Sequence, residues 1–311
     1  MWQRQLYISP FVRWLRIINR TIPGGEIHNL KLPSDQNFHA YQSRFAPHLS
    51  FFPEEENIGK QYLRKVGLRD EDKFLCFFSR DSRYLDEVYA YRSREEWSYH
   101  DFRDASIENH VPAIEYMVQH NGYYAFRMGS LVKERLNTNN PKIIDYASNG
   151  DRTELLDLYL CANCYFFLQS GGSGIASVAR VFQRPLVPVN QVPLQWCHGN
   201  PVTVFIPKKL WLKGKKRFMT FKEILESGVG MYMKSQEYEC AGIECVQNTP
   251  EEITATVIEA DKRIRGIWKS TQEDDVLQKQ FQSLFSESEL CGRQRSLIGA
   301  SFLRQNRDLL E

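Results

Sequence analysis

The sequence lacks any apolar run of about 18 residues, the length that a membrane-spanning helix needs. It also lacks an excess of one charge, because 40 Lys and Arg stand against 38 Asp and Glu, for a net charge of +2. This balance, with no basic run interleaved with aromatics, gives no reason to expect nucleic acid as a partner. With 42% hydrophobic and 25% charged residues in 311, the composition is that of a soluble globular protein with a sizeable core.

The cysteines do not form the two closely spaced pairs of a structural zinc site. Cys161 and Cys164 lie in an apolar run, where cysteine packs as a small hydrophobe, and the other close pair is Cys240 and Cys245. The seven cysteines are an odd number, and no secretory leader pattern precedes them. We therefore expect free thiols, no metal site and a cytoplasmic location.

Hydrophobic periodicity predicts strands that alternate with helices from about residue 70 onward. Short apolar runs indicate buried strands at 74–78, 123–126, 142–147, 164–169 and 185–190. Helical spacing, N-caps and glycine stops indicate helices at 55–66, 106–121, 155–163, 175–182 and 249–268. This alternation is typical of a doubly wound α/β domain with a parallel sheet. In such a domain, ligands bind at the carboxyl ends of the strands.

A serine- and glycine-rich loop joins the fourth predicted strand to the helix that follows it, and it consists of Ser170, Gly171, Gly172, Ser173 and Gly174. Such a loop exposes the unpaired N–H groups of the helix start, and the helix dipole adds partial positive charge there. The loop is therefore a candidate site for a phosphate or pyrophosphate, with a plain strand-to-helix turn as the alternative. No Lys-Ser/Thr pair follows, which excludes a Walker A loop. Ser177 and the lack of an acidic residue after the next strand disfavour a dinucleotide-binding dehydrogenase.

Polar residues also follow the other predicted strands. Arg80 and Asp81 follow the first strand and Arg127 the second, while Asp145 and Asn190 follow the third and fifth. An arginine fork suits a diphosphate, and Asp81 is a candidate general base. Each residue alone is equally well explained by ordinary charge pairing or capping. Together, at one edge of one sheet, they favour a ligand that carries phosphate.

Two basic segments suggest contact with an anionic surface. Residues 11–20 predict a helix with Phe11, Trp14 and Ile18 on one face and arginines on another. Residues 208–217 contain six basic residues in ten. Each segment is either a peripheral contact with a membrane or a lipid-linked acceptor, or a solvated basic surface.

Five stretches together resemble a family of bacterial glycosyltransferases encoded in surface-polysaccharide loci. They are 78–85 (FSRDSRYL), 91–129, 143–147 (IIDYA), 157–194 and 242–253 (GIECVQNTPEEI). Members of that family resemble the GT-B architecture of two Rossmann-like halves, and the resemblance covers roughly residues 70–268. Phe78 stands where a strand-end motif of the form His-x-Arg-Asp has histidine, so imidazole base catalysis is not expected there.

The resemblance implies a domain organisation. Residues 71–270 would form the Rossmann-like half that binds a nucleotide-sugar, and residues 271–311 a helical tail. About 70 residues precede the first strand of this half, fewer than the roughly 100 of a complete Rossmann half. Residues 1–70 are thus expected to be a partial acceptor-side region.

The resemblance also implies an activity and its residues. The loop from Ser170 to Gly174, with Arg127, would bind the donor diphosphate, while Arg80 and Asp81 would face the acceptor. The enzyme would transfer the sugar to a surface glycan or a lipid-linked acceptor, without metal or cofactor, in the cytoplasm and peripherally at the inner membrane. The alternatives are an enzyme like the sugar-nucleotide 2-epimerases and a truncated, non-catalytic nucleotide-binding or scaffold protein.

Overall fold

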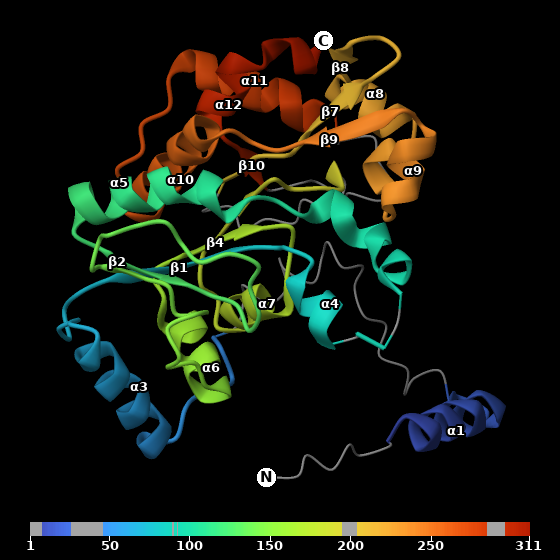
Figure 1. Cartoon of the computed structure of the whole chain (residues 1–311). Helices are drawn as coiled ribbons and strands as arrows, with labels where there is room; N and C mark the ends of the chain where they lie inside the picture. The colour runs from blue at the N-terminus through green and yellow to red at the C-terminus, as the bar shows by residue number, and fades with distance from the viewer. Residues whose placement is uncertain (1–7, 26–45, 89, 92, 195–203, 285–295) are drawn as a thin grey trace. The chain divides into compact units, whose positions relative to one another are not determined.

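The structure, a computed structural model, describes residues 8–25, 46–88, 90–91, 93–194, 204–284 and 296–311 (Figure 1). The chain divides into two units, Met1–Phe38 and His39–Glu311. The first unit contains helix α1 (Ile8–Thr21), which confirms the helix predicted over 11–20. The second unit contains all the other helices and strands that the structure describes.

A five-stranded parallel sheet forms the centre of the second unit. Its strands are β1 (Phe74–Ser79), β2 (Tyr124–Arg127), β3 (Ile143–Ile144), β4 (Phe167–Ser170) and β5 (Leu186–Val189). They lie in the order β3-β2-β1-β4-β5, and every neighbouring pair is parallel. The predicted α/β class with a parallel sheet is confirmed. The strand order reverses between β1 and β4, and ligands of open α/β sheets bind at such a switch point.

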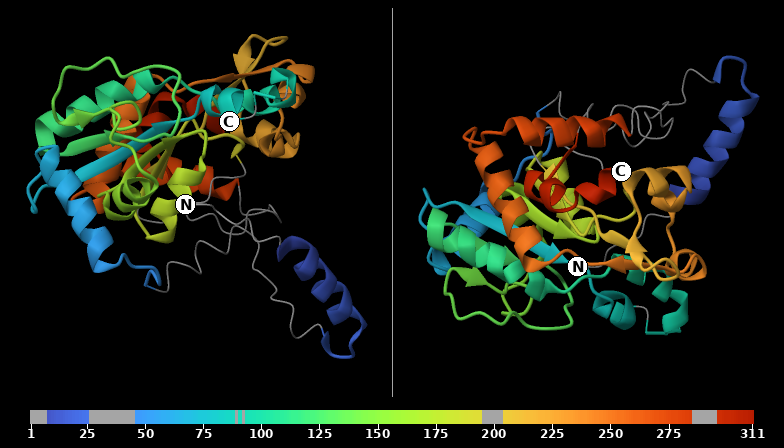
Figure 2. Two further views of the ribbon diagram at one scale, coloured as in Figure 1. Left: turned by 60° about the horizontal axis from the view of Figure 1, so that its bottom comes forward. Right: turned by 90° about the horizontal axis from the view of Figure 1, so that it is seen from above.

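Side chains that alternate along β1 contribute to two cores on opposite faces of the sheet. Leu75 and Phe77 belong to one core, and Phe74 and Cys76 to the other. The first face is covered by α5 (Val111–Asn121) and α10 (Pro250–Ile264), and the second by α3 (Pro53–Lys65), α6 (Glu154–Asn163) and α7 (Gly174–Val181) (Figures 1 and 2). Thr249 is the N-cap of α10, because its hydroxyl accepts the Glu252 N–H.

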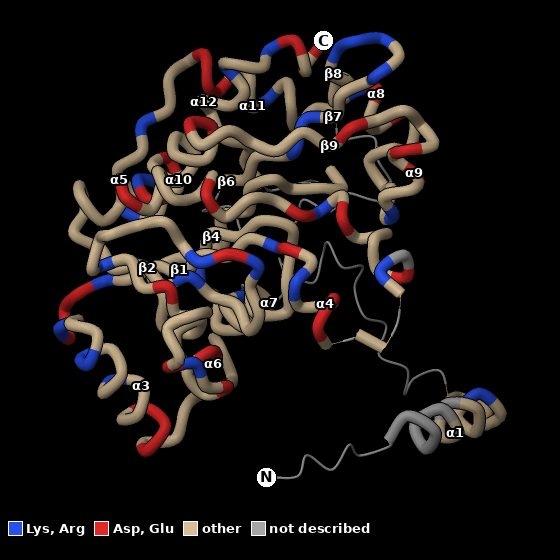
Figure 3. Tube along the Cα trace, viewed as in Figure 1, with Lys and Arg blue, Asp and Glu red and all other residues tan. Residues whose placement is uncertain are grey.

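The chain after β5 adds small sheets that the sequence did not predict. The two-stranded sheet pairs β6 (Val204–Phe205) with β10 (Leu297–Ile298) in parallel, and the antiparallel sheet has the order β8-β7-β9, with β7 (Lys209–Leu212), β8 (Arg217–Phe218) and β9 (Ile243–Val246). Beyond β6, the Ile206 N–H donates to the Pro188 carbonyl over 3.0 Å, which joins this region to β5. The basic run 208–217 is largely the β-hairpin of β7 and β8, whose charges are visible in Figure 3.

Short helices complete the second unit. They are α4 (Arg83–Val88), α8 (Phe221–Glu226), α9 (Ser235–Cys240), α11 (Gln272–Ser283), α12 (Ala300–Gln305) and the 3-10 helices η2 (Arg94–Glu96), η3 (Ser98–Arg103), η4 (Ile107–His110), η6 (Val229–Met231) and η7 (Arg307–Leu310). Helix α3 packs on α6, and α12 packs on both α10 and α11. Across the described ranges, no helix has both the length and the apolar character required to cross a bilayer.

Candidate functional site

The predicted glycine loop lies at the switch point between β1 and β4. Ser170, the last residue of β4, is in register with Ser79, the last residue of β1. The next N–H along the chain, that of Arg80, donates to the Ser170 carbonyl over 3.1 Å. At the other end of the loop, Ser173 is the N-cap of α7, and its hydroxyl accepts the Ala176 N–H. The loop and Arg80 are thus brought together as the sequence predicted.

The loop is closely packed at one glycine and open at the others. Gly171 and Gly172 have left-handed backbones, with φ of +78° and +65°, which glycine adopts without steric cost. A Cβ added to Gly171 would lie 2.5 Å from the Arg103 carbonyl oxygen and 2.7 Å from Arg80 Cβ. At Gly172 and Gly174, such an atom would meet nothing within 4 Å among the described residues. The open end of the loop is therefore its helix side.

A cavity of about 570 Å³ borders the carboxyl end of β1. Its walls come mainly from four parts of the chain: the ends of β1 and β2, the loop residues Lys133 and Glu134, the segment 101–107, and the region of β7, α9 and β9. The residues of the glycine loop themselves do not line it. Arg80 does, and it also packs on Gly171, so this side chain lies between the loop and the cavity.

Arg80 forms an ion pair across this boundary. Its Nε lies 3.0 Å from Asp104 Oδ1, although the two atoms are not aligned as a hydrogen bond. Burial raises the pKa of the Asp104 carboxyl to about 6, even though the charges of Arg80 and Lys208 act to lower it. Asp104 therefore combines access to the cavity with a pKa close to neutral, the property that a general base needs. No local sequence pattern marks this residue.

Asp81, the base expected from the sequence, also lines the cavity, but both of its carboxylate oxygens are engaged. Oδ1 accepts the Arg83 N–H over 2.9 Å, and Oδ2 accepts the Lys133 N–H over 3.1 Å. These two hydrogen bonds tie the start of α4 and the 131–134 loop to the residue that follows the carboxyl end of β1. The site thus contains two carboxylates with different surroundings, one that organises loops and one that is paired with an arginine.

Arg127 and Asp145 are brought together, but as a support for a loop. Arg127 is almost fully buried, its Nη1 donates to the Glu134 carbonyl, and the same atom lies 3.4 Å from Asp145 Oδ1. The other Asp145 oxygen accepts the Leu136 N–H over 3.0 Å and the Ser148 hydroxyl over 2.6 Å. Arg127 borders the cavity, yet it is less available to a ligand than Arg80, because 3% of its side chain is exposed against 15% for Arg80.

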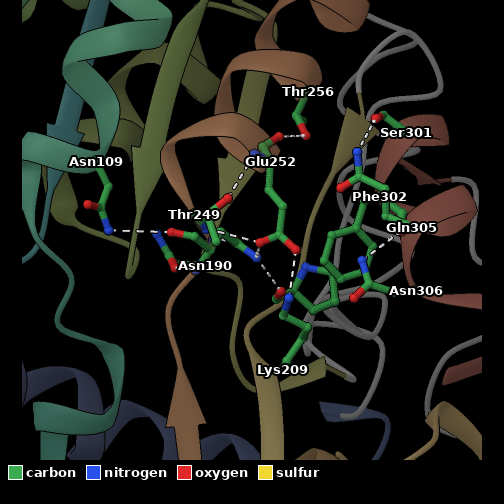
Figure 4. A network of polar contacts seen from close by, with 12 residues as sticks. Asn109, Asn190, Lys209, Thr249, Glu252, Thr256, Ser301, Phe302, Gln305 and Asn306 are labelled. Atoms are coloured by element: carbon green, nitrogen blue, oxygen red, sulfur yellow. Dashed lines mark hydrogen bonds and ion pairs between the residues drawn. The ribbon is translucent and has the colours of Figure 1, made fainter. Parts of the chain in front are cut away.

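Asn190 lies away from the cavity, in a buried polar network. It and Asn248 each donate a backbone N–H to the other's side-chain oxygen. The Asn248 amide then reaches the Pro207 carbonyl over 2.9 Å, and Lys209 Nζ lies 2.7 Å from Glu252 Oε1 (Figure 4). This network fixes β5 to the start of α10 and to β7.

The cavity wall formed by residues 101–107 and the residues just before it, 98–100, carry no local sequence pattern that marks them. Lys208, which is buried, donates to the carbonyls of Phe102 and Asp104 over 2.9 and 2.7 Å. The Ser235 hydroxyl accepts the Phe102 N–H over 3.1 Å and donates to the Ser98 carbonyl over 2.7 Å. Burial lowers the pKa of Lys208 to about 8. These contacts join residues more than 100 positions apart, and no local pattern marks them.

A solvated basic surface is therefore the wrong interpretation for part of the run 208–217. Lys208 and Lys209 have buried partners, whereas Lys213, Lys215 and Lys216 are exposed. Within the described ranges, no cluster of three or more His, Cys, Asp or Glu side chains is arranged to hold a metal ion. Cys76, Cys161 and Cys164 are free, buried thiols of the core.

Comparisons with protein-family models, with curated proteins and with solved structures found no match.

Proposed function

We propose that this protein is a bacterial glycosyltransferase of GT-B type, which transfers a sugar from a nucleotide-sugar to a surface-glycan or lipid-linked acceptor. The observation that carries the proposal is the meeting of the glycine loop with Arg80 at the switch point of a parallel sheet. A diphosphate at the open end of the loop would accept N–H groups at the start of α7 and would lie near a guanidinium.

The proposed chemistry is displacement of the sugar from the diphosphate by an acceptor hydroxyl. Negative charge develops on the leaving diphosphate, and fixed N–H groups and arginines stabilise it without a metal ion. The cavity beside Arg80 would hold the sugar and the acceptor. Asp81 and Asp104 both border that cavity and are the candidates to accept the proton of the hydroxyl.

The proposed location is the cytoplasm, with peripheral contact at the inner membrane. Helix α1 has Arg20 in its last turn and no acidic residue in its first turn. The turn between β7 and β8 exposes Lys213, Lys215 and Lys216. Basic segments of this kind are attracted to anionic lipid headgroups.

A non-catalytic nucleotide-binding protein is the second candidate. The described residues contain one Rossmann-like sheet, whereas a GT-B enzyme uses two. Such a protein would bind nucleotide at the same loop and transfer nothing.

Thermal unfolding in the presence of UDP, GDP, CMP or ADP tests the donor site. A ligand at about 100 times its dissociation constant should stabilise the folded chain by about 2.7 kcal/mol. Gly172→Val should abolish this stabilisation, because the new side chain occupies the open end of the loop. Gly150→Val is the matched control, since Gly150 also has a positive φ, +85°, and open space around it. No stabilisation by any nucleotide would overturn the proposal. Stabilisation without transfer to any acceptor would favour the second candidate.

A further inference from the structure

Two arginines flank the closed end of the glycine loop. The Arg103 carbonyl oxygen lies 2.5 Å, and Arg80 Cδ 3.3 Å, from the place of a Cβ on Gly171. Residue 103 ends η3, so the backbone of that 3-10 helix passes against the loop. Only glycine allows this approach. The tight contact therefore brings the backbone of a segment distant in sequence against the loop, and the guanidinium of Arg103 lies within electrostatic reach of Arg80.

Polar atoms around this contact are buried without hydrogen-bond partners among the described residues. They are Arg80 Nε and Asp104 Oδ1, which lie 3.0 Å apart as an ion pair, together with Arg103 Nε, His100 Nδ1 and the hydroxyl of Ser170, a residue with no exposed surface. Buried polar groups in folded proteins nearly always have a partner, so several unpaired ones in one place call for an explanation. The two guanidinium nitrogens are donors only. An acceptor-rich group would satisfy them.

The electrostatics of this region are those of an anion site. Burial and the charge of Arg80 lower the pKa of Arg103. Burial and the charges of both arginines lower the pKa of His100 to about 4. The two guanidinium groups thus repel each other. Asp104 is paired with Arg80 and offsets part of this charge.

We propose that Arg103 and Arg80 together bind a diphosphate group, holding it against the N–H groups of Gly172, Ser173 and Gly174. This inference rests on the proposed function for the loop, and it assigns the cationic role to Arg103 in place of Arg127. Arg127 donates to the Glu134 carbonyl and pairs with Asp145, whereas Arg103 Nε has no such partner. The shared chemistry is the diphosphate, whether it belongs to a nucleotide, a lipid or the inorganic ion.

Titration calorimetry with inorganic pyrophosphate tests this pair in the full chain. We expect one site per chain, and we expect Arg103→Gln to weaken binding about tenfold or more, because a charge-assisted fork is lost. Arg69→Gln is the matched control. It removes the same charge from an exposed residue just before the amino end of β1, at the opposite edge of the sheet. Unchanged affinity in Arg103→Gln, or no binding of pyrophosphate to the native chain, would overturn the inference.

If Arg103→Gln does not fold, Arg103→Lys replaces it in the same titration with pyrophosphate. It keeps the charge but not the fork, and it should weaken pyrophosphate binding by several-fold. Affinity equal to that of the native chain would count against the inference.

Three further ligands separate this inference from the proposed function: UDP, GDP and geranyl diphosphate. If pyrophosphate binding needs Arg103 but no nucleotide binds, the diphosphate site stands and the proposed donor does not. If a nucleotide binds equally well to native and Arg103→Gln chains, the donor site stands and the role of Arg103 is refuted. Selective binding of geranyl diphosphate would place the lipid-linked substrate, not the donor, at the loop.

Discussion

Asn190 and Asn248 exchange two hydrogen bonds of 2.6 Å each, in which the backbone N–H of one residue meets the side-chain oxygen of the other. Both residues are fully buried, and they are 58 positions apart in the chain. Asn190 also has a φ of +51°, a left-handed conformation that asparagine tolerates better than most residues. The pair joins the end of the central sheet to the start of α10.

We expect Asn190→Ala to destabilise the fold by about 2–4 kcal/mol, because it leaves a buried N–H unpaired and places alanine at a positive φ. Urea unfolding measures this loss. Asn190→Gly removes the side chain without the backbone strain, and it should fall between alanine and the native residue. A glycine variant as stable as the native chain would show that the exchanged bonds contribute nothing.

Substitutions at neighbouring glycines should have unequal effects. Gly171→Ala places a Cβ 2.5 Å from the Arg103 carbonyl oxygen and should cost about 3 kcal/mol or more, since backbone must move. Gly172→Ala meets no atom and should cost about 1 kcal/mol, from its positive φ alone. Unfolding in urea gives both values. Equal losses would contradict the close packing of the loop on residues 80 and 103.

The two cavity carboxylates can be separated by their variants. We expect Asp104→Asn to lower turnover about 100-fold or more, as loss of a general base does, and not to weaken nucleotide binding, because it removes only the countercharge of Arg80. In the native chain the rate of the proposed transfer should fall as pH drops below about 6, where Asp104 becomes protonated. Asp81→Asn, unlike Asp104→Asn, should also lower the melting temperature, because the Asp81 carboxylate accepts two backbone N–H groups. If the rate of Asp104→Asn still fell below about pH 6, the general base would be a different residue.

His110 should make stability depend on pH. Burial lowers its pKa to about 4, so the folded chain keeps it neutral while the unfolded chain protonates it below about 6.5. Its contribution is thus present above pH 6.5 and is lost as pH falls toward 4. Between pH 7.5 and 5 this loss amounts to about 2 kcal/mol.

His110→Asn should remove that part of the dependence, as measured by urea unfolding at the two pH values. Asp104, whose pKa is raised, acts in the opposite direction in the same window, so the difference between variant and native chain is the decisive quantity. The same change in unfolding free energy between the two pH values in the variant and native chains would contradict the prediction.

Transfer should continue in the presence of a chelator. Arginines and helix N–H groups already meet the proposed diphosphate, so no divalent ion is required to neutralise it. Turnover measured with excess EDTA should match turnover without it. Strict loss of activity, restored by a divalent cation, would contradict this expectation.

The sequence predicts the central sheet well because its strands are buried on both faces and read as apolar runs. Phe74 to Phe78 and the run before Ser170 are visible in this way, and glycines and serines mark where they end. Strand β3, by contrast, spans only Ile143–Ile144, so the prediction over 142–147 was too long. Local pattern also shows that polar residues follow the strands.

Local pattern cannot show which polar side chains are already engaged. Arg127 and Arg80 look alike in sequence, yet one is tied to Asp145 and the Glu134 carbonyl while the other borders the loop. The 94–107 segment has neither strand nor helix periodicity, because it forms short 3-10 turns. Its place beside the loop depends on Lys208 and Ser235, which are remote in the chain.

That attachment is made through the backbone of residues 98–104. Lys208 and Ser235 bind the carbonyls of Ser98, Phe102 and Asp104 and the N–H of Phe102, so the anchoring groups are present whatever side chains these positions carry. Asp101 and Asp104, which line the cavity, can therefore be exchanged during evolution while the wall keeps its place. A protein built in this way can diversify the ligand it accepts by changing a few adjacent codons.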